Sequence, residues 1–109
     1  MIQIKKFITI GLFASLLSLA AFGDCVIDQG PYEDDYGYAQ FPFYNSCDES
    51  FTVNLCVKSY PPGSELPVYN LYSGLNYGRS PMTLSDGKWD SFDSYKWVAG
   101  GPVDCPFYD

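Results

Sequence analysis

Glycine and proline recur so closely along this chain that no long helix fits between residue 30 and the C-terminus. They include Gly30, Pro31, Pro61, Pro62, Gly63, Pro67, Gly74, Gly78, Pro81, Gly87, Gly100, Gly101 and Pro102. The short segments that they delimit are rich in Tyr, Phe, Val and Trp. Short aromatic and β-branched segments between turn residues are typical of an all-β domain.

One segment alternates with the two-residue period of a strand, in which successive side chains point to opposite faces. Its apolar face carries Phe51, Val53, Leu55 and Val57, and its other face carries Thr52, Asn54, Cys56 and Lys58. Further strands are expected at 38–44, 68–72, 82–85 and 94–99.

Pro42 cannot donate to a β-ladder, so its strand is expected at a sheet edge. Residues 88–99 fit either a short helix or a strand, and we predict a strand in their C-terminal half. Phe51, Trp97 and Phe41 are the first candidates for the core. The chain is therefore expected to form a small β-sandwich or Greek-key barrel of roughly six short strands, held by disulfides.

The first 23 residues have the three parts of a secretory signal peptide. Lys5 and Lys6 form a positive region, an apolar run follows over residues 7–21, and Ala21 and Gly23 precede a cleavage site at Asp24. The apolar run is shorter than the roughly 20 residues that span a bilayer. We expect a cleaved signal peptide at 1–23 and one exported domain at 24–109, periplasmic or extracellular and without membrane attachment.

The cysteines indicate how so small a domain is stabilised. A chain of 86 residues, 24–109, buries only a small core. The mature part holds all four cysteines: Cys25, Cys47, Cys56 and Cys105. An even count in an exported chain predicts two disulfides, for which three pairings are open. We favour Cys47–Cys56 as a local clamp and Cys25–Cys105 as a tie between the chain ends.

Several kinds of chemistry are disfavoured by the residue types. The chain has no histidine, which removes Ser-His-Asp and Cys-His nucleophiles and most transition-metal sites. Its cysteine spacings contain no C-x2-C zinc knuckle, and the EF-hand loop pattern is absent. Nothing in the acidic groups at 33–35 and Asp86/Asp90/Asp93 indicates the one buried and one exposed carboxylate of an acid–base pair. We expect no enzyme activity, no cofactor and no metal.

The charge of the mature chain favours a cationic partner. Removal of Lys5 and Lys6 takes the formal net charge from −7 to −9. Such a charge repels nucleic acid and anionic lipid and attracts basic proteins. The alternative is that the charge only keeps the surface soluble.

Aromatic side chains are the most informative feature that remains. The mature chain holds ten Tyr, five Phe and two Trp, too many for so small a core. Tyrosine tolerates partial exposure. Exposed Tyr and Trp either anchor a protein–protein interface, stack on sugar rings, or form an idle surface.

We therefore expect a non-enzymatic, exported binding protein of the inhibitor or immunity type, which recognises a basic extracytoplasmic protein. The candidate binding residues are Tyr32, Asp34, Asp35, Tyr36, Tyr72, Tyr77, Trp89 and Asp90. A second hypothesis is a carbohydrate-binding module that stacks sugar on Trp89, Tyr72 and Tyr77. A third is a secreted effector or toxin, which the sequence does not separate from the first.

Overall fold

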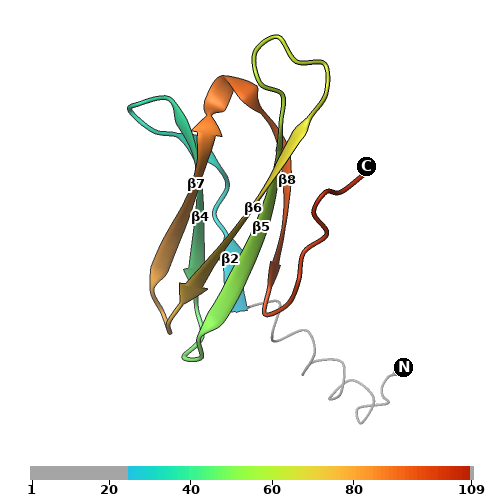
Figure 1. Ribbon diagram of the computed structural model, residues 1–109. Coiled ribbons are helices and arrows are strands. Elements are labelled where there is room, and N and C mark those ends of the chain that lie inside the picture. The colour runs from blue at the N-terminus through green and yellow to red at the C-terminus, as the bar shows by residue number, and fades with distance from the viewer. Residues whose placement is uncertain (1–24, 109) are drawn as a thin grey trace, which may run out of the picture.

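The computed structural model describes residues 25–108, so the expected signal peptide lies outside the described residues. The described part is all-β, with seven strands and one 3-10 turn (Figure 1). The elements are β2 (Val26–Asp28), β3 (Tyr32–Glu33), β4 (Tyr38–Asn45), β5 (Phe51–Ser59), β6 (Val68–Asn76), β7 (Pro81–Lys88), η1 (Trp89–Ser91) and β8 (Phe92–Ala99).

The strands form two antiparallel sheets that pack face to face. In one sheet β4 pairs with β7 along one side and with β2 and β3 along the other, and the second sheet has the order β6-β5-β8. Because β8 returns to lie beside β5, the four strands from β5 to β8 follow a Greek-key path. The expected disulfide-linked β-sandwich is confirmed.

The core lies between β4 and β5. Phe41, Phe43, Val53, Leu55 and Val57 are fully buried there. All four apolar residues of the alternating segment 51–57 face inward, as their period predicts. Two of the three expected core aromatics, Phe41 and Phe51, are buried. Trp97 is half-buried and packs its ring 5.1 Å from that of Phe43.

Strand β6 is longer than expected, and it runs through a glycine that allows close packing against β7. We expected the strand to end at Tyr72, but it continues through Gly74 to Asn76. A Cβ atom at Gly74 would lie 2.6 Å from Met82 Sδ of β7. The missing side chain therefore lets β6 and β7 approach each other at one edge of the sandwich, a positional role of glycine in strands.

The polarity of β6 is inverted relative to β5. Its inward positions include Asn70, Tyr72 and Asn76, whereas Leu71 and Leu75 point outward and are exposed. Because the inward residues are polar and the outward residues apolar, the hydrophobicity pattern of this strand does not reveal which of its faces is buried. The C-terminal half of segment 88–99 is a strand, as predicted.

Pro42 is not on an edge strand, because β4 has neighbours on both sides. Its carbonyl accepts a hydrogen bond from the Gln29 backbone N–H at 3.0 Å. In an antiparallel ladder the nitrogen and carbonyl of one residue face the same neighbour. The nitrogen of Pro42 therefore also faces Gln29, and the bond that proline cannot donate falls where β2 has just ended.

The favoured disulfide pairing was wrong. Cys25 pairs with Cys47 and Cys56 pairs with Cys105. Cys25 precedes β2 and Cys47 follows β4, and the register of these strands, with Val26 opposite Asn45, brings the two cysteines together.

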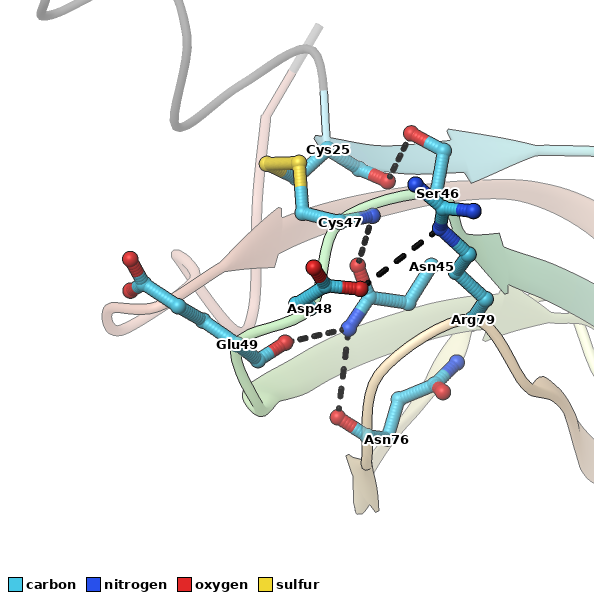
Figure 2. Close-up of a disulfide and its surroundings, with 8 residues drawn as sticks. All are labelled: Cys25, Asn45, Ser46, Cys47, Asp48, Glu49, Asn76 and Arg79. Carbon is cyan, nitrogen blue, oxygen red and sulfur yellow. Dashed lines mark hydrogen bonds and ion pairs between the residues drawn. A yellow bond between two sulfur atoms is a disulfide. The ribbon is translucent and has the colours of Figure 1, made fainter.

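Asn45 organises the turn that carries Cys47, as Figure 2 shows. It is fully buried, its Nδ2 donates to the Glu49 carbonyl at 2.6 Å, and its Oδ1 accepts from the Cys47 N–H at 3.0 Å. The side chain thereby satisfies backbone groups that the turn leaves without ladder partners.

The second disulfide fastens the C-terminal segment to the outer face of the β6-β5-β8 sheet. Cys56 lies on the outward row of β5, and Asn54 two residues earlier donates from Nδ2 to the Gly101 carbonyl at 2.7 Å. Phe107 is buried with its ring 5.4 Å from that of Tyr69. Residues 101–107 thus cover the middle of this sheet face.

Candidate functional site

Three connections meet at one end of the sandwich, which we call the loop end: residues 34–37 between β3 and β4, residues 60–67 between β5 and β6, and η1 between β7 and β8 (Figure 1). They are joined by backbone hydrogen bonds. The Trp89 N–H donates to the Gly37 carbonyl at 2.8 Å, and the Tyr60 N–H donates to the Ser91 carbonyl at 2.7 Å. The loop end is therefore one connected surface.

Asp34 fixes the conformation of the first loop. Its Oδ1 accepts from the backbone N–H groups of Tyr36 and Tyr38, each at 2.9 Å, and its Oδ2 accepts from Gln40 Nε2 at 2.7 Å. The bond from the Tyr38 N–H is the largest reason that the pKa of Asp34 lies below its ordinary value. Asp34 positions two aromatic residues, so its carboxylate is already engaged within the chain.

The rings at the loop end stand out from the surface. Tyr36 at the tip of the hairpin is 79% exposed, and Tyr32, Tyr38 and Tyr60 are also exposed. Gly37 has φ +88°, a left-handed conformation that glycine adopts without strain and that allows the tight reversal after Tyr36. Because Asp34 fixes the backbone of Tyr36, less backbone freedom is lost on binding than in a flexible loop.

The exposed charges of the loop end are mainly negative. Glu33, Asp35, Glu65 and Asp90 are exposed there. Two basic side chains of the described residues lie at this end: Lys88, the last residue of β7, and Lys58, whose Nζ lies 5.7 Å from the centre of the Tyr60 ring and pairs with Asp93. The loop end therefore combines exposed tyrosine rings with a negative potential.

Six of the eight predicted binding residues lie at or beside this end: Tyr32, Asp34, Asp35, Tyr36, Trp89 and Asp90. Their roles differ. Tyr36, Asp35, Tyr32 and Asp90 are exposed, whereas Trp89 is half-buried and packs 5.1 Å from the ring of Phe92.

The other two predicted residues lie elsewhere. Tyr77 is in the connection between β6 and β7, at the opposite end from Trp89, with about 25 Å of β7 between them. Tyr72 is half-buried inside the sandwich, where its hydroxyl donates to the Asp86 carboxylate. Trp89, Tyr72 and Tyr77 therefore do not form one stacking platform.

Tyr72 belongs to a pair of tyrosine–aspartate bonds that join the two sheets. Its bond to Asp86 links β6 to β7. The Tyr95 hydroxyl donates to Asp28 Oδ2 at 2.6 Å and links β8 to β2 at the other side. Burial, followed by the bond to Asp28, raises the pKa of Tyr95 to about 12. Burial and the bond to Asp86 also raise the pKa of Tyr72.

Within residues 25–108, no three His, Cys, Asp or Glu side chains group closely enough to hold a metal ion. The described strands and turns include no helix long and apolar enough to cross a membrane.

Comparison with models of known families, with curated proteins and with solved structures finds no match to this chain. The geometry of the loop end is therefore the basis for a functional proposal.

Three features of this end escaped the sequence analysis: Tyr38, the loop 60–67 with its exposed Leu66, and Lys88. A usable signal was present. In a chain of consecutive antiparallel strands every second connection lies at the same end, so the turn residues Pro61–Gly63 belong with the hairpin at 33–38 and with η1.

Proposed function

We propose that this protein is exported and acts by binding a basic protein partner through the loop end. The observation that carries the proposal is the exposed Tyr36 at a hairpin tip whose backbone Asp34 holds, with the exposed carboxylates of Glu33 and Asp35 in the same hairpin. Tyrosine is enriched among residues that dominate interface energies, and negative charge accelerates encounter with a basic surface.

The disulfides support the compartment in this proposal. All four cysteines are paired, which is compatible with an oxidising location. In that compartment a small acidic binding domain would work as inhibitors and immunity proteins do: it would cover the surface of a basic target and catalyse no reaction. This comparison rests on size, charge and compartment.

Affinity capture tests the proposal. The purified, oxidised protein is immobilised, exposed to extracellular and periplasmic extracts at low salt, and eluted with a salt step. We expect a basic protein whose association rate with the purified chain falls steeply between low and physiological ionic strength, because salt screens exposed charges over about 10 Å at 0.1 M. Retention of glycan that is insensitive to salt would contradict the proposal and favour carbohydrate binding.

A further inference from the structure

Lys88 occupies a small niche at the loop end. Its Nζ donates to the Tyr36 carbonyl at 3.0 Å and lies 4.5 Å from the centre of the Tyr38 ring. Both contacts are of kinds that bind an ammonium group, a hydrogen bond to a carbonyl oxygen and a cation–π contact. The carbonyl and the ring thus form a receptor for a primary ammonium, which the chain fills with its own lysine.

The fold builds this niche without help from Lys88. Tyr38 lies directly opposite Lys88 in the β4–β7 ladder, so the strands set the place of the ring. Asp34 holds the Tyr36 and Tyr38 backbones, and the Trp89 N–H fixes the Gly37 carbonyl beside them. These contacts come from other groups, so the niche persists when the ammonium leaves.

Lys88 itself is held in the niche by few contacts. The side chain is exposed, and among residues 25–108 it makes no ion pair, in contrast to Lys58 with Asp93 and Arg79 with Asp48. Glu33 completes the surroundings, since its Oε2 and Lys88 Nζ lie at 3.6 and 3.7 Å from the position of a Cβ on Gly37. An ammonium held by exposed contacts is replaceable by another.

We propose that the niche of the Tyr36 carbonyl and the Tyr38 ring is the point at which the loop end receives a lysine side chain of its partner, with Lys88 as the group that is displaced. The inference rests on the proposed function and adds the chemical group that is recognised. Lys88 thereby lowers the affinity of the free protein for stray ammonium groups, because an incoming lysine must displace it.

A lysine peptide tests this directly. Acetylated, amidated pentalysine is titrated into the 15N-labelled protein, and the amide shifts of Gly37 and Trp89 report binding at the niche. Lys88→Gln should tighten binding roughly two- to fivefold relative to the wild type, which is the range of one exposed cation–π contact. Shifts confined to other parts of the protein would overturn the inference.

Two variants separate the niche from simple electrostatics. Arg79→Gln removes the same charge at the opposite end and should leave pentalysine binding unchanged. Lys88→Gln combined with Tyr38→Leu has the charge of Lys88→Gln but lacks the ring, so the gain in affinity should disappear. Persistence of the gain in the double variant would show that only local charge acts, and the inference would fail.

The wild-type protein supplies a readout that needs no variant. Lys88 Nζ lies over the Tyr38 ring, so the adjacent Hε protons should be shifted upfield. Pentalysine should move them back downfield as it displaces the ammonium. Hε shifts that stay fixed at saturation would overturn the inference. If a captured partner binds at the loop end with equal affinity for the wild type and Lys88→Gln, the inference about the niche is wrong and the proposed function stands. If the partner binds elsewhere on the protein, the proposed function is wrong.

Discussion

At the scale of single residues, the acidic groups divide into those that hold the fold and those that face solvent. Asp34, Asp28 and Asp86 each accept hydrogen bonds from the chain, whereas Asp35 and Asp90 are exposed at the loop end. Both Asp34 and Asp35 were predicted to bind a partner, because the sequence does not show which of two neighbouring carboxylates accepts hydrogen bonds within the chain. Only the hairpin, which returns the Tyr38 N–H to Asp34, distinguishes them.

Acid should loosen the hairpin by protonating Asp34. Its pKa is lowered, first by the bond from the Tyr38 N–H, so the loop is stabilised above the ordinary pKa of 3.8 and loses this stabilisation as the pH falls through the lowered value. We expect the protection factors of the Tyr36 and Tyr38 amides, relative to the intrinsic exchange rate at each pH, to fall and their resonances to shift between pH 5 and 2 in NMR spectra. In Asp34→Ala these amides should already exchange fast at pH 5, and equal protection in that variant would contradict the role of Asp34.

Alkali should weaken the bonds between the sheets. The pKa of Tyr95 is raised from 10.0 to about 12, so the neutral phenol contributes stability below pH 10 that is lost as the pH rises toward 12. The free energy of unfolding, measured in urea from pH 8 to 12, should fall over that range. Tyr95→Phe should cost about 1 kcal/mol at pH 8 and flatten the decline above pH 10. An unchanged slope would exclude Tyr95 as a cause.

At the scale of elements, the strands that the sequence reveals are those with one apolar face. β5 alternates clearly, and its bounds are predicted to within one residue. β2 and β3 were missed because three and two residues are too short to show a period. β6 was expected to end at Tyr72, two residues before Gly74, since a glycine in a strand pattern resembles a break. The role of Gly74, close approach to Met82, depends on another strand.

A side chain at position 74 should separate β6 from β7. Gly74→Val places atoms against Met82 and Leu84, and such overpacking costs about 1–3 kcal/mol. Chemical denaturation should show this loss. Gly87→Val is the matched control, because a Cβ at Gly87 meets nothing within 4 Å, and it should leave the stability nearly unchanged. Equal effects of the two substitutions would contradict the close approach of β6 and β7.

At the scale of the whole molecule, the number of disulfides was predictable from the sequence and their pairing was not. Cys56 and Cys47 are near in sequence, but Cys56 lies in the middle of β5 on the outer face, where the returning C-terminal segment reaches it. Pairing follows from register and from the path of the tail. The loop end was partly predictable: six of the predicted binding residues lie at or beside it, but its assembly from three loops requires the topology.

Removal of each disulfide should have a different cost. In the chain-entropy view, loops of 22 and 49 residues contribute about 3 and about 4 kcal/mol. Replacement of both Cys56 and Cys105 by Ala should therefore destabilise the protein more than replacement of Cys25 and Cys47, and it also frees the segment that buries Phe107. Urea unfolding measures both. A non-reduced digest that links Cys47 to Cys56 would contradict the structure.

The central claim is that the loop end, rather than the general acidity of the chain, binds the partner. Two double variants test it, because each removes one exposed tyrosine and one exposed aspartate: Tyr36→Ala with Asp35→Asn at the loop end, and Tyr77→Ala with Asp48→Asn at the other. The measurement is the amount of basic protein that each immobilised variant captures at low salt. We predict loss of capture for the loop-end variant and wild-type capture for its control. Equal capture by both variants would contradict the claim.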